Sequence, residues 1–337
     1  MAVSHEIQYF LGANSPTGFY SLYSELLPPE TASVIYILKG GPGCGKSTLM
    51  RQVAQQAAQA GETVEYILCS ADPDSLDAVV LPRLGAALVD GTAPHVVEPK
   101  YPGAVEQYVN LGDCYDRAGL RAIRGEILTC MDGYKEHYQR AYRCLTAAAQ
   151  IGEDLRSLLL TPALEAKMAK RARGILSREV KKGDGEAGRA VQRFLGGVTW
   201  KGVLCQFETV DALCKRVYEL ADTYGLAHSM LTHLAAGALA SGHDVIVCPS
   251  PLFPDRMEHL LIPSLSLAFV SASPSLPYPK RPYRRIRLDA MADAELLRRN
   301  KARLKFSRKV SAALVEEAVD SLAQAKAMHD ELEGLYN

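Results

Sequence analysis

Two patterns of apolar and polar positions alternate along the first part of the chain. Residues 34–38 form a short apolar run rich in β-branched residues, which predicts a buried strand. Residues 49–54 begin a helical pattern, and residues 63–69 and 84–90 are further apolar runs, the last ending at a carboxylate. Strands that alternate with helices predict an α/β fold built on a parallel sheet.

A longer helical pattern follows these strands. Apolar residues recur at helical spacing over residues 116–178, which predicts a helical hairpin at about 115–180. The end of this stretch, residues 167–182, is basic. Residues 183–188 contain three glycines, so we predict a linker at 183–192.

The segment between the first predicted strand and helix carries a specific motif. Gly40 to Ser47 fits the pattern G-x-x-x-x-G-K-[ST] of a phosphate-binding P-loop. Glycines let the backbone turn its N–H groups around an anion, and the helix that follows adds the positive end of its dipole. The residues predicted to bind ATP are Gly40, Gly41, Pro42, Gly43, Cys44, Gly45, Lys46, Ser47 and Thr48.

Carboxylates downstream of the motif suggest the rest of a catalytic site. Asp90 ends an apolar run, as in the Walker B pattern, and we predict that it holds Mg²⁺ together with Ser47. Lys46 is predicted to contact the β- and γ-phosphates. Asp72 is the proposed general base, with Asp74 as a second candidate. The alternative role for these two residues is helix N-capping in a Pro-Asp-Ser turn.

Two further residues near Asp90 are candidate sensors of the γ-phosphate. Thr92 and His95 follow Asp90 in the same loop. For His95 a surface or core position is the alternative, because a lone histidine carries no specific signal.

The second half of the chain repeats the pattern of the first in the same order. Residues 216–221 take the place of the first P-loop strand, and residues 225–231 take the place of residues 43–49. We therefore predict two P-loop NTPase-like parallel-sheet domains in tandem, each followed by a helical hairpin. The predicted bounds are 1–182 for the active domain and 193–337 for a degenerate repeat with a helical tail.

The second copy lacks the residues that the chemistry needs. His228 stands at the lysine position, Ala227 at a glycine position, and Ser271 at the position of the Walker B carboxylate. Asp222 opens the loop and would place a negative charge against a phosphate. We predict a P-loop-like fold without a working site in this half.

The motifs of the first half resemble a known group of proteins. Residues 39–48, 69–77 and 89–95, together with Phe10, are similar to those of a bacterial family of tandem P-loop proteins. Members of that family are generally labelled predicted ATPases or nucleotide kinases. The resemblance implies ATP and Mg²⁺ binding at the first loop, and it implies no particular substrate.

The composition of the chain argues against several classes of protein and several kinds of site. The 337 residues carry 38 basic and 38 acidic side chains, and this zero net charge argues against a protein that mainly coats nucleic acid. The eight cysteines contain no C-x-x-C pair, so neither a zinc site nor a thioredoxin-like motif is predicted. No signal peptide or transmembrane helix is expected, and we predict a cytoplasmic protein that does not use a membrane.

Three functions fit these features. The first is a Mg²⁺-dependent ATPase whose hydrolysis moves the helical hairpins or an unknown protein or small-molecule partner. An ATP switch that does not turn over is its non-catalytic version. The second is a nucleotide or small-molecule kinase, for which residues 167–182 would supply arginines. The third is a nucleic-acid-linked ATPase that uses the basic segment 280–285, and the low aromatic content of 7% disfavours it.

Overall fold

The chain forms two compact units in the computed structural model, which describes residues 6–94, 97–181, 183 and 186–336. The first unit comprises Met1–Arg143, Gly197–Leu204 and Glu317–Asn337. The second comprises Cys144–Gly196 and Cys205–Glu316. These units are not the contiguous ranges 1–182 and 193–337, because a hairpin and a helix end from the second half of the sequence pack within the first unit.

The first unit is built on a six-stranded sheet with the order β1-β5-β6-β7-β4-β8. The strands are β1 (Ile7–Phe10), β4 (Val34–Lys39), β5 (Glu65–Leu68), β6 (Leu76–Leu81), β7 (Ala86–Asp90) and β8 (Glu106–Asn110). Strands β1 and β5 are parallel, as are β4 and its two neighbours β7 and β8. Strand β6 runs antiparallel to both β5 and β7, so the sheet is mixed, not wholly parallel as the sequence suggested.

Strand β6 is the element that the sequence patterns did not reveal. All six of its residues are buried, and Asp77 is its one charged residue. The carboxylate of Asp77 accepts a hydrogen bond of 2.8 Å from the Tyr23 hydroxyl, which compensates for its removal from water. The turn that contains Asp72 and Asp74 thus gives way to strand at Leu76.

The second unit has a sheet with the same architecture. Its strands are β9 (Ala190–Gln192), β12 (Arg216–Ala221), β13 (Val245–Ser250), β14 (Phe253–Ile262), β15 (Leu267–Ala272) and β16 (Arg284–Arg287). Their order, β9-β13-β14-β15-β12-β16, matches the first sheet strand for strand. The pairing directions match as well, with β14 antiparallel to both its neighbours. Two tandem α/β sheets of this kind agree with the predicted fold class.

Each unit also contains helices and short connecting elements. The α-helices are α1 (Lys46–Gln59), α2 (Arg117–Ala122), α3 (Arg124–Leu159), α4 (Pro162–Glu179), α5 (Phe207–Leu213), α6 (Ala227–Ala240), α7 (Ala294–Arg299) and α8 (Lys301–Tyr336). The 3₁₀-helices are η1 (Tyr23–Glu25), η2 (Pro82–Leu84), η3 (Leu111–Cys114), η4 (Pro263–Leu265) and η5 (Asp289–Met291). Two hairpins, β2 (Gly12–Ser15) with β3 (Gly18–Ser21) and β10 (Gly196–Thr199) with β11 (Gly202–Cys205), form separate two-stranded sheets.

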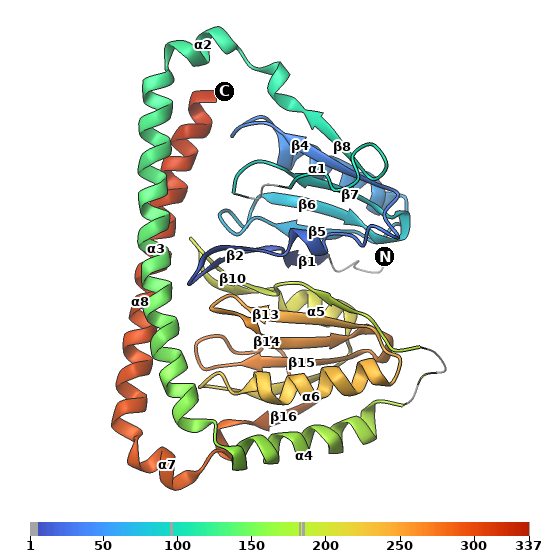
Figure 1. The fold of residues 1–337 in the computed structure, drawn as a ribbon, viewed down its shortest axis with the longest axis vertical. Helices are drawn as coiled ribbons and strands as arrows, with labels where there is room; N and C mark the ends of the chain where they lie inside the picture. Colours follow the sequence, from blue (N-terminus) through green and yellow to red (C-terminus); the bar gives the residue numbers. More distant parts are fainter. Residues whose placement is uncertain (1–5, 95–96, 182, 184–185, 337) are drawn as a thin grey trace. The chain divides into compact units, whose positions relative to one another are not determined.

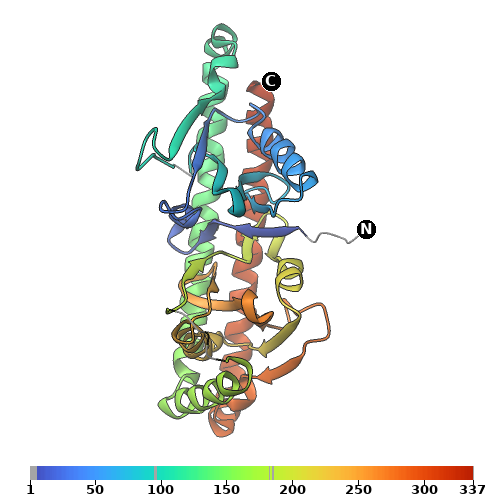
Figure 2. The same ribbon diagram turned by 90° about the vertical axis from the view of Figure 1, so that its right-hand side faces the viewer.

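Within the first unit, the beginning of α3 and the end of α8 lie side by side (Figures 1 and 2). Ile127, Cys130 and Leu332 form the buried centre of their contact. The Cys130 thiol donates to the carbonyl oxygen of Met328 at 3.0 Å. The end of the last helix, from Glu317 onward, is therefore part of the first unit, although the sequence assigns it to the second repeat.

Within the second unit, α4 packs along α6 and both helices contribute to the core. Leu164, Met168, Ala172 and Ile175 of α4 are buried in one cluster with apolar residues of α6 and of the sheet. These four residues recur every three or four positions, so α4 buries one face and exposes the other. None of the helices in the described ranges is long and apolar enough to cross a lipid bilayer.

Candidate functional site

The loop between β4 and α1 has a backbone that requires glycine. Gly43 and Gly45 have φ angles of 73° and 81°, in the left-handed region that residues with a Cβ rarely adopt. A Cβ added to Gly40 would lie 2.6 Å from the Sγ atom of Cys44, which is too close for an ordinary contact. The motif glycines therefore shape the loop locally. Pro42 lies in its turn, and Thr48 is exposed in the first turn of α1.

Lys46 lies at the start of α1 and turns its ammonium group into this loop. Its Nζ atom donates to the carbonyl oxygens of Gly40 at 2.7 Å and Gly41 at 2.8 Å. The same atom lies 3.5 Å from Oδ2 of Asp90, and both side chains are largely buried, with exposed fractions of 11% and 14%. The structure therefore brings together the lysine of the motif and the carboxylate that follows it by more than forty residues.

The parallel register of β4 and β7 places Asp90 beside the loop. Asp90 is the last residue of β7 and pairs with Leu38, the second-last residue of β4. Its Oδ1 atom accepts a hydrogen bond of 2.8 Å from the backbone N–H of Thr92. The Thr92 hydroxyl donates to the carbonyl oxygen of Gly40 at 2.8 Å, which ties this turn to the loop. His95, the other predicted sensor, lies outside the described residues.

Ser47 links α1 to the beginning of β6. Its hydroxyl oxygen accepts a hydrogen bond of 3.0 Å from the backbone N–H of Leu76. A hydroxyl oxygen has two lone pairs, so this bond leaves one that can serve a cation. Ser47 and Asp90 offer the oxygen ligands that Mg²⁺ prefers.

The Asp72 carboxylate is held by several donors of the first unit. Its Oδ2 atom accepts from the Ser75 hydroxyl at 2.9 Å and lies 3.7 Å from the Lys326 ammonium group. Its Oδ1 atom accepts from the Trp200 indole N–H and from the backbone N–H of Asp74, both at 3.4 Å. This arrangement orders the turn at 72–75, but strand β6 follows the turn, so the helix N-capping considered as the alternative is wrong. The role of Asp72 as a general base stays a prediction.

Two tyrosines from distant parts of the sequence border the loop at Gly41. The rings of Tyr115 and Tyr336 lie 5.4 Å apart. A Cβ added to Gly41 would lie 2.9 Å from the Tyr115 hydroxyl oxygen and 3.2 Å from a ring carbon of Tyr336. Burial and the neighbouring Cys44 raise the pKa of Tyr115 above its ordinary value, so this phenol stays protonated. No motif marks either tyrosine, because only the packing of α8 brings them to the loop.

A second basic residue fixes the segment that follows Asp90. The Lys39 ammonium group donates to the carbonyl oxygen of Gly91 at 2.8 Å and to Oε1 of Glu98 at 3.2 Å. It also lies 5.4 Å from the centre of the Tyr108 ring. The hydrogen bonds from Tyr108 and Lys39 lower the pKa of Glu98. Lys39 thus restrains the chain around Thr92 and lies outside the motif itself.

The equivalent loop in the second unit uses its backbone differently. Asp222, at the position of Gly40, accepts hydrogen bonds from three backbone N–H groups of its own loop. They belong to Tyr224 at 3.2 Å, Leu226 at 2.9 Å and Ala227 at 2.7 Å. Burial raises the pKa of this carboxyl and these N–H donors oppose the shift. An internal carboxylate therefore occupies the N–H groups that a P-loop offers to phosphate.

His228, at the position of Lys46, has also taken a structural role. Its Nδ1 atom accepts a hydrogen bond of 3.0 Å from the backbone N–H of Met257. Burial and the nearby Arg256 lower the pKa of this histidine, which favours the neutral ring. Ala227 already belongs to helix α6, whereas Gly45 stands before α1 in the left-handed conformation. The two loops therefore differ in backbone as well as in side chains.

We expect that changing His228 to lysine does not create a second ATP site. Asp222 would still hold the loop N–H groups, and Ser271 would still lack a carboxylate. Equilibrium binding of a labelled ATP analogue should give one site per chain for the wild type and one for His228→Lys. Two sites in either protein would show that the degenerate loop still accepts a nucleotide.

Comparison with known proteins gives one local match. Residues 21–83 are similar to the family model described as nephrocystin 3, N-terminal. The matched residues include β4, the loop, α1, β5 and β6, and they make up less than a fifth of the chain. No curated protein and no solved structure matches the chain. The match supports a P-loop-like region loosely, and the bacterial tandem P-loop family stays a resemblance.

Proposed function

We propose that the chain binds ATP with Mg²⁺ at the loop of the first unit and hydrolyses it there. The observation that carries this proposal is the convergence of Lys46 and Asp90 across a glycine-dependent loop, with 3.5 Å between Nζ and Oδ2. Each of these features was expected from a separate part of the sequence. A turn that only connects a strand to a helix requires neither a largely buried lysine nor a carboxylate at the end of the adjacent parallel strand.

Each residue has a role that follows from its position. The loop N–H groups and the N-terminus of α1 would attract the phosphates, because the helix dipole is positive at that end. The Lys46 ammonium has three donors, and we propose that it exchanges the carbonyl oxygens of Gly40 and Gly41 for phosphate oxygens. The Thr92 hydroxyl donates to the carbonyl oxygen of Gly40, so we expect Thr92 to move when Gly40 moves.

Mg²⁺ fits the oxygen donors at this site. Ser47 would contribute the free lone pair of its hydroxyl, and Asp90 its carboxylate, directly or through water. Held by Ser47 and Asp90, Mg²⁺ would supply positive charge that offsets the negative charge developing during phosphoryl transfer. A nucleotide or small-molecule kinase remains the second hypothesis. The arginine-rich segment considered for a kinase lid belongs to α4, which packs on α6 in the second unit.

An assay of the purified full-length chain tests this proposal directly. Binding of ATP should be measurable by calorimetry with a stoichiometry of one, and phosphate release should require Mg²⁺ and stop with EDTA. The assay is repeated with nucleoside monophosphates, DNA and RNA. A phosphorylated monophosphate product would favour the kinase, and failure to bind ATP at millimolar concentration would contradict the proposal.

A further inference from the structure

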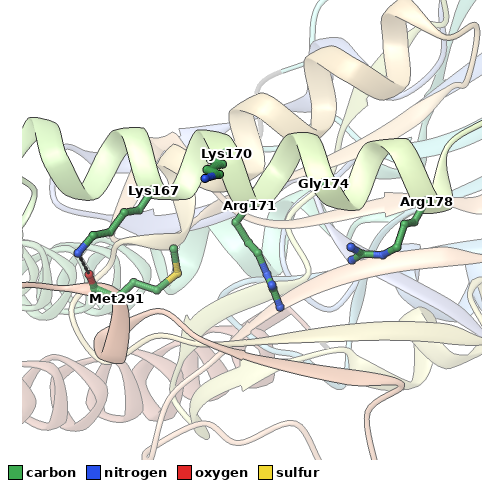
Figure 3. A pocket seen from close by; sticks show the side chains of 6 residues that line it. All are labelled: Lys167, Lys170, Arg171, Gly174, Arg178 and Met291. Carbon is green, nitrogen blue, oxygen red and sulfur yellow. Dashed lines mark hydrogen bonds between the residues drawn. The ribbon is translucent and has the colours of Figure 1, made fainter.

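The exposed face of α4 carries a row of cations along a groove in the second unit. The groove has a volume of about 390 Å³ and is lined by Lys167, Lys170, Arg171, Gly174, Arg178 and Met291. These α4 residues recur at intervals of three, one, three and four, so they share one side of the helix. Figure 3 shows Lys167, Arg171 and Arg178 extending from the same side of α4. An adjacent side of α4, which carries Leu164, Met168, Ala172 and Ile175, is the one buried in the core with α6.

The charge of this groove is not neutralised by its own lining. Among the residues that the structure describes, no carboxylate lines it. Lys167 donates to the carbonyl oxygen of Met291 at 3.3 Å, a bond that leaves its positive charge in place. In the described part of the chain, Lys170, Arg171 and Arg178 form no ion pair. Four cations within one groove therefore present a concentrated positive charge to an external anion.

The groove has room at its middle and extends along the helix. A Cβ added to Gly174 would meet just one atom within contact range, Nη1 of Arg178 at 4.0 Å. From Lys167 to Arg178 the helix rises about 16 Å, since each residue adds about 1.5 Å. A row of this length matches several successive phosphates of a chain better than one phosphate ion.

The fold joins the end of this groove to a second basic segment. Glu179, the last residue of α4, accepts from the Tyr218 hydroxyl at 2.6 Å and pairs with Arg216 on β12. The Tyr218 ring lies 5.6 Å from that of Tyr283, and the Arg284 guanidinium lies 5.4 Å from the Tyr283 ring centre. Tyr218 on β12 therefore links Glu179, at the end of α4, to Tyr283, about one hundred residues further along the sequence.

Tyr283 gives this end of the groove an aromatic surface. Its side chain is 47% exposed, next to the buried Tyr218. Other cations of the segment are engaged, since Lys280 pairs with Asp211 and Arg285 with Glu219. Single strands are bound by cations that contact the backbone and by aromatic rings that stack on bases, and the cationic groove together with the exposed Tyr283 ring supplies both.

We propose that this groove binds a single-stranded polynucleotide, with α4 contacting successive phosphates and Tyr283 stacking on a base. An acidic peptide would match the cations but has no base for the ring to stack on. A duplex would match the charge and keep its bases stacked inside. All the residues of this proposed site belong to the second unit.

The direct test is fluorescence anisotropy of the full-length chain with labelled 20-nucleotide strands of DNA and of RNA. If the four cations each contact one phosphate, log affinity should fall with log salt at a slope of about −2.8, from about 0.7 per contact. A blunt duplex and polyglutamate of similar charge serve as competitors. Equal competition by polyglutamate, or tighter binding of the duplex, would overturn the assignment to single strands.

Two substitutions at Gly174 distinguish the effect of added charge on binding from the effect of added side-chain size. Gly174→Glu and Gly174→Gln add side chains of the same size and both favour helix over glycine. We expect Gly174→Glu to weaken binding at least about tenfold relative to Gly174→Gln, since it places a carboxylate among the four cations. Equal affinity of the two variants would show that the strand does not lie in this groove.

A second pair of variants keeps the test independent of one position. Lys170→Glu with Arg171→Glu should remove two contacts and reduce the salt slope by about 1.4. The control, Lys135→Glu with Lys309→Glu, changes the net charge equally at exposed lysines that do not line the groove.

Tyr283→Leu should lower affinity about 5-fold to 150-fold with the salt slope unchanged. Equal binding by the groove and control variants, or no effect of Tyr283→Leu, would contradict the model.

Discussion

Replacing Asp90 with asparagine is expected to reduce Mg²⁺-dependent ATP turnover by about a hundredfold or more, while much of the ATP affinity remains. Asparagine retains an oxygen that accepts from the N–H of Thr92, as Oδ1 of Asp90 does at 2.8 Å. It loses the negative charge proposed to hold Mg²⁺ and to face Lys46. A hundredfold loss corresponds to about 2.7 kcal/mol of transition-state stabilisation, within the range that a metal ion supplies.

The measurement is steady-state phosphate release over a range of Mg²⁺ concentrations, with ATP affinity measured separately. Asp132→Asn is a matched control, because it removes the same charge from an exposed aspartate on α3. The control should hydrolyse ATP like the wild type. Wild-type turnover by Asp90→Asn would show that this carboxylate does not take part, whatever its distance from Lys46.

Replacing Lys46 with alanine is expected to lower ATP affinity tenfold to a hundredfold. A charge-assisted hydrogen bond to phosphate contributes about 1.5–3 kcal/mol, which corresponds to this range. The fold should persist, because Lys46 bonds two carbonyl oxygens of the loop and makes no contribution to the apolar core. The variant therefore separates nucleotide binding from folding.

Calorimetric titration with ATP and Mg²⁺ measures this effect, and circular dichroism checks the fold. Lys100→Ala serves as the control, since it removes one exposed lysine outside the loop. A folded Lys46→Ala protein that binds ATP as tightly as the wild type would rule out the loop as the phosphate site. A loss of binding in the control as well would indicate a general effect of charge.

The loops of the two units differ at one position, and that position decides what the backbone N–H groups of the loop bind. Gly40 and Asp222 occupy the same place after equivalent strands, which pair in the same register with β7 and β15. Without a side chain, Gly40 leaves the loop N–H groups to an outside anion. Asp222 supplies an anion from within, at 2.7–3.2 Å from three of them. The second unit therefore keeps the loop, and the side chain of Asp222 accepts the hydrogen bonds of its N–H groups.

The sequence alone predicted the features that depend on neighbours in the chain. The positive φ angles of Gly43 and Gly45 follow from local backbone needs, and so does the helix that begins at Lys46. The end of an apolar run also located Asp90 correctly at the end of a strand. These features are predictable because each depends on steric limits and burial patterns within a few residues.

The tertiary structure decided which distant segments meet. It inserted β6 antiparallel in the sheet, an orientation that a buried apolar run does not encode. It brought Tyr336 and Tyr115 to Gly41 through the packing of α8. It also joined the cations of α4 to Tyr283, through Glu179 and Tyr218. Helical spacing shows that one face of α4 is apolar and the other is basic. The element that borders each face depends on strand order and on long-range packing.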